Sequence, residues 1–252
     1  MENTLELDDG GFLSYRYNHG GRSKTVLFMH GTLSDKNSTK SLFLEEYCKD
    51  NDLSFAAFDF TGHGQSSGKY EQATIGVWLR DALEIIDRVI VDDVYLVGSS
   101  MGGWIALLAA KERPDRVKGV VGLAAAADFT ADVWAAFSDE QKKKILDDGV
   151  IYTPNGWTEQ GDPWSRDLFW EAEQHFVLQG TGSFDLTCPL VLIHGEKDDC
   201  VPVRTAFKIM DAVKTQNCKA VVLKGAGHRL SEPSDLKTLS TELNLLTADD
   251  GE

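Results

Sequence analysis

The sequence predicts an α/β protein with a mostly parallel sheet of about eight strands and helices on both faces. Short apolar runs without a break alternate with amphipathic stretches of helix length. Unbroken apolar strands are typical of a parallel sheet that is covered on both faces, and the alternation is typical of a doubly wound sheet. The expected buried strands cover residues 25–29, 54–58, 94–97, 119–124, 190–193 and 220–223.

The start of the chain and the stretches between the apolar runs complete this architecture. Residues 5–7 and 12–17 alternate apolar with polar around Asp9-Gly10-Gly11, which predicts a hairpin. In residues 74–91 the apolar side chains recur at intervals of three and four, which indicates a helix. We expect further helices over residues 39–50, 101–113, 203–214 and 235–247.

Composition limits the classes of function. The 252 residues carry a net charge of −15, which disfavours nucleic acid and anionic membranes as partners. The N-terminus is acidic and lacks the apolar stretch of a secretory signal, and no apolar run reaches the length of a membrane span. The four cysteines form no C-x-x-C pair, so we expect a cytoplasmic protein with reduced thiols.

Residues 128–184 interrupt the alternation, and we expect no strand there. This stretch is about twice what a simple crossover needs, which predicts a helical cap inserted into a single domain of residues 1–252. It holds four of the six tryptophans, and we expect most of its aromatic side chains to fasten the cap while two or three face a ligand. The four are Trp134, Trp157, Trp164 and Trp170.

The strongest functional motif is Gly98-Ser99-Ser100-Met101-Gly102, a G-x-S-x-G sequence. It follows an apolar strand and precedes an amphipathic helix, which is the setting of a nucleophile elbow. A tight turn requires small flanking residues, and it projects the central hydroxyl above the sheet. Ser100 is therefore the candidate nucleophile, and Ser99 is its structural neighbour.

The candidate acid is Asp198, which follows the expected strand over residues 190–193. Catalytic groups in α/β enzymes gather at the carboxyl ends of the strands. Asp199 is a better candidate for capping the helix that should begin near Pro202. Asp128, which follows the preceding strand, is a rival acid.

The candidate base is His228 in Gly225-Ala226-Gly227-His228, after the last expected strand. Glycines allow the loop to bring the imidazole to a serine, and the order Ser, Asp, His is that of the hydrolase triad. We expect the remaining histidines to be structural: His30 and His194 in His-Gly pairs at strand ends, His63 in a Gly-His-Gly turn, His19 in a polar loop and His175 in the cap.

An oxyanion needs two backbone N–H donors. Met101, directly after the candidate nucleophile, is expected to provide one. The loop His30-Gly31-Thr32-Leu33 follows the first buried strand and should provide the other, from Thr32 or, failing that, from Leu33.

Together these motifs resemble the α/β-hydrolase superfamily, to which Asp59-x-x-Gly62-His63-Gly64-x-Ser66 adds a further likeness. The segments GSSMGGW, AAAADF, EAEQHFVL, CPLVLIHGEKDDCVP and GHRLSE are similar to the α/β-hydrolase-domain-10 group. This resemblance implies a palmitoyl-protein thioesterase or an acyl-glucuronide esterase. Animal members carry a mitochondrial transit peptide, which this sequence does not show.

The function that these patterns favour is a serine hydrolase that cleaves small or acyl-chain esters or thioesters. Its partner would be the substrate, which includes S-acylated proteins, and we expect no cofactor, no metal and no transmembrane segment. Other activities of the same triad remain open, namely those of a peptidase, lipase, carbon–carbon hydrolase or perhydrolase. The alternative of another class is a hydrolase-fold binding protein without catalysis.

Overall fold

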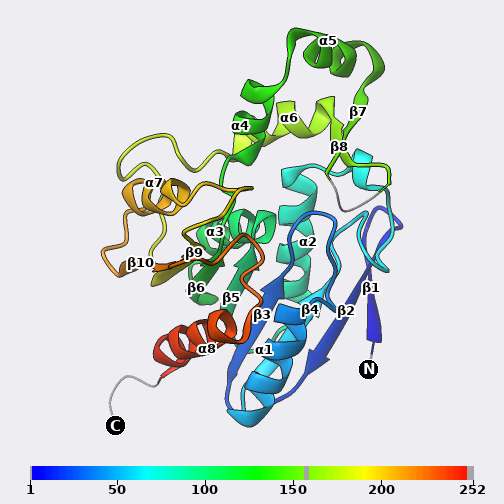
Figure 1. Ribbon diagram of the computed structural model, residues 1–252. Helices are drawn as coiled ribbons and strands as arrows, with labels where there is room; N and C mark the ends of the chain where they lie inside the picture. Colours follow the sequence, from blue (N-terminus) through cyan, green and yellow to red (C-terminus); the bar gives the residue numbers. More distant parts are fainter. Residues whose placement is uncertain (1, 156–158, 249–252) are drawn as a thin grey trace.

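Eight strands form the central sheet, in the order β1-β2-β4-β3-β5-β6-β9-β10 (Figure 1). The computed structural model describes residues 2–155 and 159–248. The strands are β1 (Glu2–Glu6), β2 (Phe12–Asn18), β3 (Lys24–Met29), β4 (Ser54–Phe58), β5 (Asp93–Ser99), β6 (Val117–Leu123), β9 (Leu190–Gly195) and β10 (Cys218–Leu223).

The β1–β2 hairpin is antiparallel and joins β4 in antiparallel register, whereas all later neighbours pair in parallel. The predicted sheet is therefore confirmed in strand number and in its mostly parallel pairing. The order of the strands places β5 at the centre, between β3 and β6. Because parallel strands end at the same edge, the segments that follow β3, β5, β9 and β10 meet there.

Helices cover both faces of the sheet. Two hydrophobic clusters separate the faces: one includes side chains of α2, α3 and α7, and the other includes side chains of α1 and α8. The helices begin and end within three residues of the predicted bounds. They are α1 (Thr39–Asp50), α2 (Ile75–Arg88), α3 (Met101–Glu112), α7 (Arg204–Ala212) and α8 (Pro233–Thr247), with the short η1 (Tyr70–Gln72) before α2.

Residues 128–184, here called the insertion, stand above the carboxyl edge of the sheet (Figure 1). They contain α4 (Phe129–Ala136), α5 (Asp139–Asp148), α6 (Arg166–Ala172) and η2 (Glu173–His175). The prediction of no strand was wrong: β7 (Val150–Thr153) pairs antiparallel with β8 (Asp162–Ser165). Two four-residue strands, one of which contains a proline, are too short to show an alternating pattern in the sequence.

The aromatic side chains of the insertion pack mainly on one another. The Trp164 ring stacks on the Phe169 ring at 5.9 Å, and Trp134 contacts Phe169 at 5.2 Å and Trp170 at 5.5 Å. Phe169 is buried, whereas 48% of Trp170 is exposed. These rings therefore form a small core of the insertion's own, as expected for most of them. Trp157 lies outside the described residues.

Asp128 fastens the two ends of the insertion to each other. Its Oδ1 and Oδ2 accept hydrogen bonds from the backbone N–H groups of Val177 and Leu178, both at 2.8 Å. Burial raises the pKa of Asp128 despite these two bonds. The carboxylate is thus occupied in closing the insertion, and it does not contact His228 among the described residues.

Two further hydrogen bonds join the insertion to the body. Trp104 Nε1 on α3 donates to the carbonyl of His175 at 3.1 Å. The Glu171 carboxylate accepts the N–H of Gly76 at the start of α2, at 3.0 Å, and lies 2.6 Å from His175 Nε2. The root of the insertion is therefore tied to both helices beneath it. In the part of the chain described, no helix is long and apolar enough to cross a bilayer.

Replacing Asp128 tests this closure. Asp128→Asn places an amide N–H against one of the two buried backbone donors, so we expect the free energy of unfolding to fall by about 1–3 kcal/mol. For a chain of this size that corresponds to roughly 2–4 °C in Tm per kcal/mol. Asp132→Asn, an exposed acid on the same helix, is the control and should leave Tm unchanged. Equal Tm values for both variants would contradict the assignment.

Candidate active site

The turn between β5 and α3 holds Ser100 in a strained backbone conformation. Its φ of 55° and ψ of −120° lie in a region that residues with side chains rarely adopt. The motif glycines make this turn possible: a Cβ on Gly98 would lie 2.2 Å from the Gly102 carbonyl oxygen, and one on Gly102 would lie 2.3 Å from that of Met29. The contact is too close for any larger residue, which explains the motif in physical terms.

His228 connects the candidate nucleophile to the candidate acid. Its Nε2 lies 3.0 Å from Ser100 Oγ, and its Nδ1 lies 2.8 Å from Asp198 Oδ2. Because a carboxylate can only accept, Nδ1 carries the hydrogen, and Nε2 is left to accept the serine proton. The structure thus brings together the three residues that the sequence predicted, over separations of 128 and 30 positions.

Two contacts fix the loop that carries His228. The N–H of Gly225 donates to Glu196 Oε2 at 2.9 Å, and Lys40 Nζ donates to the carbonyl of Arg229 at 2.6 Å. Burial lowers the pKa of Lys40 to about 8. The sequence analysis did not identify Glu196 or Lys40. Glu196 lies within a segment quoted above, but neither residue shows its role in the sequence, because each acts through a backbone group of a distant loop.

The Asp198 carboxylate is completely buried and receives hydrogen bonds on both oxygens. Oδ1 accepts the backbone N–H groups of Cys200 at 3.0 Å and Val201 at 2.8 Å, and Oδ2 faces His228. Burial by itself raises the pKa of Asp198, but the donors, His194 and His228 foremost, outweigh it and hold the pKa below its usual range. The carboxylate therefore stays ionised at any pH near neutrality.

The alternatives to Asp198 have other surroundings. Asp199 is exposed, and its Oδ1 lies 3.6 Å from Cys200 Sγ. The prediction that Asp199 caps the next helix was wrong, because α7 begins at Arg204 without a side-chain cap. The turn that starts at Asp198 uses the Asp198 carboxylate instead, as an Asx turn.

The loop after β3 lies directly against the candidate nucleophile. Gly31 lies so close to Ser100 that a Cβ on this glycine would be 3.1 Å from the Ser100 Cβ. Thr32 is the next residue along the loop, so its backbone N–H lies near the serine. Met101 opens α3, and the N–H groups of a first helical turn have no partner within the helix. Leu33 has a φ of 53° and an exposed side chain.

A buried ion pair supports this loop from behind. Lys36 Nζ donates to Asp59 Oδ2 at 2.8 Å and to Gln65 Oε1 at 3.0 Å, while the Lys36 N–H donates to Asp59 Oδ1 at 2.7 Å. Both charged side chains are 1% exposed or less. The Asp59-x-x-Gly-His-Gly motif therefore anchors the loop after β3. Lys36 escaped the sequence analysis because a single lysine in a polar loop resembles any surface residue.

His30 connects the same loop to the end of β4. Its Nδ1 lies 2.7 Å from the Gly31 carbonyl, to which it donates, and its Nε2 accepts the N–H of Phe60 at 3.2 Å. Burial lowers the pKa of His30, and burial together with the nearby His30 lowers the pKa of His63 to about 3. Both rings are thus neutral and structural, as the sequence analysis expected.

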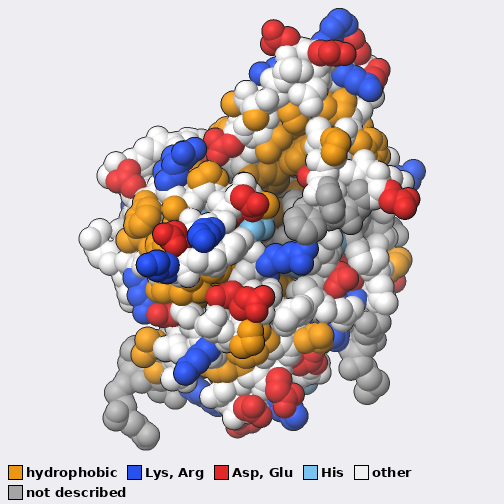
Figure 2. Space-filling model, in the orientation of Figure 1, with side chains coloured by type: hydrophobic (Ala, Val, Ile, Leu, Met, Phe, Trp, Pro, Cys, Tyr) orange, Lys and Arg blue, Asp and Glu red, His pale blue; other side chains and the backbone are white. Residues whose placement is uncertain are grey.

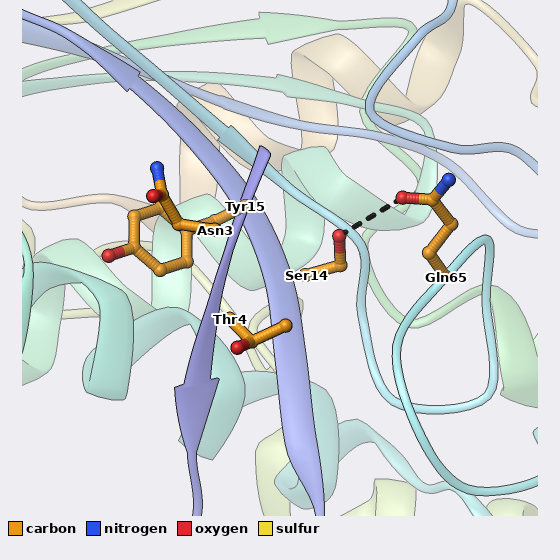
Figure 3. A pocket seen from close by; sticks show the side chains of 5 residues that line it. All are labelled: Asn3, Thr4, Ser14, Tyr15 and Gln65. Carbon is orange, nitrogen blue, oxygen red and sulfur yellow. Dashed lines mark hydrogen bonds between the residues drawn. The ribbon is translucent and has the colours of Figure 1, made fainter. Parts of the chain in front are cut away.

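Apolar side chains gather on the insertion above a hollow in which a histidine side chain is visible (Figure 2). Two other cavities lie away from this hollow. One, of 510 Å³, is at the β1–β2 edge and has a polar lining that includes the Ser14–Gln65 hydrogen bond (Figure 3). The other, of 500 Å³, lies beside the β10 edge. Neither is lined by Ser100 or His228, so we place the chemistry in the hollow beneath the insertion.

Among the described residues, one group of side chains has metal-ligand character: Asp198, Cys200 and His228, whose ligand atoms lie within 4.8 Å of one another. Hydrogen bonds already fill the carboxylate, and one of them comes from His228. A cation would have to break that bond, so the group as it stands does not suit a metal ion.

The chain matches the family described as "Serine aminopeptidase, S33" over residues 20–150, slightly more than half of its length. Among curated proteins it is 37% identical over 220 residues to the human protein named "Palmitoyl-protein thioesterase ABHD10, mitochondrial". That match covers 87% of this chain and 71% of the relative.

Solved structures give the same result. "Alpha/beta hydrolase domain-containing protein 10 from mouse" superimposes with a TM-score of 0.89 at 32% identity and covers 98% of both chains. A putative hydrolase from Agrobacterium vitis S4 superimposes with a TM-score of 0.93 at 25% identity, over 98% of this chain and 99% of the other. The chain therefore belongs to the α/β-hydrolase family of serine hydrolases, within its domain-10 type.

Proposed function

We propose that this protein hydrolyses carboxylic esters or thioesters through a Ser100–His228–Asp198 triad. The observation that carries the proposal is the position of His228, whose two ring nitrogens lie 3.0 Å from the Ser100 hydroxyl and 2.8 Å from the Asp198 carboxylate. An imidazole held between a serine and a carboxylate can take up the serine proton as the hydroxyl attacks a carbonyl.

The reaction would run in two halves. Ser100 Oγ attacks the carbonyl carbon while His228 Nε2 takes its proton, and the imidazolium then gives that proton to the leaving alcohol or thiol. Water, activated by the same imidazole, cleaves the acyl-enzyme. The backbone N–H groups of Met101 and Thr32 would stabilise each tetrahedral oxyanion, with Leu33 as the alternative second donor.

Esters or thioesters with an apolar acyl part are the substrates we favour. The apolar side chains of the insertion lie above the hollow, where they would cap the site and meet an acyl chain (Figure 2). The human relative is named a palmitoyl-protein thioesterase, which makes an S-acylated protein a candidate partner. The net charge of −15 disfavours docking on anionic bilayers. The relative's name also says mitochondrial, whereas the cytoplasmic location expected for this chain stays a prediction.

Peptide hydrolysis is the second candidate, because the matched family is described as a serine aminopeptidase. A binding protein without catalysis is the candidate of another class, and the close contacts of His228 argue against it. Reaction with a fluorophosphonate probe separates an active serine from a silent one. An assay panel of aminoacyl amides and acyl thioesters separates the two hydrolases.

Removal of the nucleophile is the most direct test. Ser100→Ala should lower kcat by roughly four to six orders of magnitude while the fold stays intact, because no other group can form the acyl-enzyme. Ser99→Ala, at the buried end of β5, is the matched control and should cost far less. A dead Ser99→Ala beside an active Ser100→Ala would overturn the assignment.

The pH dependence should reflect the imidazole. Only neutral imidazole accepts the serine proton, so kcat/KM should rise with pH, with a midpoint at about 6–8 given the ordinary titration of histidine near 6.5. The pKa of Asp198 is held below its usual range, so Asp198 stays ionised across this interval and does not contribute the rise. A rate that stays constant from about pH 5 to about 9 would argue against a histidine base.

The acyl preference follows from the apolar insertion. Each methylene that is buried contributes about 0.8 kcal/mol, so kcat/KM should increase over a series of p-nitrophenyl esters as the acyl chain lengthens from acetate. Trp170→Ala removes an exposed ring of the insertion and should reduce this gain, whereas Phe207→Ala removes an exposed ring of α7 as a control. A preference for acetate with no thioester cleavage would refute the substrate proposal.

A further inference from the structure

A second imidazole lies against the Asp198 carboxylate. His194, the next-to-last residue of strand β9, is 1% exposed. Its Nε2 lies 2.9 Å from the Val201 carbonyl oxygen and 3.2 Å from Asp198 Oδ2. Both oxygens can only accept, so Nε2 carries a hydrogen. This hydrogen faces both oxygens, and the Val201 carbonyl is the nearer of the two.

His194 is surrounded by the turn that presents the acid. Asp198 Oδ1 accepts the N–H groups of Cys200 and Val201, which closes the turn. The His194 ring contacts the last residue of that turn through its carbonyl and the first through its carboxylate. The single N–H of His194 therefore lies between a backbone carbonyl of that turn and the carboxylate that faces His228.

The same N–H also affects the charge on Asp198. Oδ2 faces two imidazoles, His228 at 2.8 Å and His194 at 3.2 Å. A second donor disperses the negative charge of the oxygen, so the carboxylate holds a positive imidazolium less tightly than it would alone. Loss of the His194 donor would therefore strengthen the attraction between the carboxylate and a positively charged imidazolium.

We propose that His194 is a positioning residue that orients Asp198 and shifts the working pH of the triad downward. The proposal rests on the proposed hydrolase function. The other titratable or polar groups near His194 and Asp198 are unchanged in a His194 variant. A difference in the pH profile is therefore caused by the loss of His194. These unchanged groups are Asp199 and Cys200 on the same turn, Asp162 on β8, Ser100, and the cations Lys40 and Arg229 beside the His228 loop.

The length of the replacing side chain makes the test specific. His194→Gln offers an N–H at about the reach of Nε2, His194→Asn offers the same amide at about the reach of Nδ1, and His194→Leu offers no donor. His19→Gln, an exposed histidine, is the control. Each variant is assayed for kcat, KM and the pH profile of kcat/KM on one p-nitrophenyl ester, with unfolding followed by circular dichroism.

We expect His194→Asn and His194→Leu to lose about tenfold or more in kcat with little change in KM, as for loss of one bond to a charged group. Their acidic limb should move upward by roughly half a pH unit or more. His194→Gln should restore most of the kcat and most of the wild-type pH profile, and His19→Gln should match the wild type. If Leu does not fold, the comparison of Gln with Asn gives the result.

A readout independent of turnover separates this proposal from the function on which it rests. The Nδ1–H proton of His228, observed by NMR in 15N-histidine-labelled protein, should move downfield in the Asn variant as its bond to the carboxylate strengthens. That shift supports the proposal even if no ester is cleaved. An Asn variant with the wild-type pH profile and the wild-type resonance would overturn it, even in an active enzyme whose Ser100→Ala variant is dead.

Discussion

The close approach of three backbones at the end of β5 is the constraint on which this structure depends. Gly98, Gly102 and the Met29 carbonyl lie so near to one another that no Cβ fits between them. This crowding sets the angle at which α3 leaves the sheet and forces Ser100 to a positive φ. The strain is tolerated because the surrounding strands are buried and cannot relax. Everything at the carboxyl edge is arranged around the position that this turn gives to one hydroxyl.

Buried polar groups hold the loops that meet this hydroxyl. Asp59 and Lys36 fix the loop after β3, and Asp198 closes its own turn while it faces His228. Each carboxylate accepts hydrogen bonds on both oxygens, because a buried charge without partners would cost several kcal/mol. Backbone donors and paired charges thus hold the loop after β3 and the turn at Asp198 in place. The same bonds preserve the ionised form of Asp198 that an imidazole partner requires.

The insertion serves a different physical purpose from the loops. It carries its own aromatic core and is tied at its root by Asp128 and by contacts to α2 and α3. Most of its rings pack on one another and hold it together, whereas about half of Trp170 is exposed. The proposed substrate, with an apolar acyl part and a carbonyl group, matches an apolar insertion above polar loops.

Sequence patterns alone predicted the sheet, the five helices of the body and all three members of the candidate triad. Apolar periodicity marks buried faces, and the glycines of the elbow are required by local sterics, so both can be recognised without the fold. The sequence favoured Asp198 as the acid, but Asp128 stayed a rival because it follows a strand as well. Only the three-dimensional contacts separate them: Asp128 binds two backbone N–H groups 49 and 50 positions away, and Asp198 meets His228.

The tertiary structure decided the features that depend on long-range hydrogen bonds. Lys36 and Lys40 have no distinguishing pattern, and the His-Gly pair at His194 does not reveal its partners. These partners are a distant carboxylate, a distant carbonyl and a turn that forms only on folding. The short strands β7 and β8 could not be predicted either, since four residues are too few to show a periodic pattern. Local sterics and burial can be predicted from sequence patterns. The partners of a buried polar group are determined only when the fold brings them within hydrogen-bonding distance.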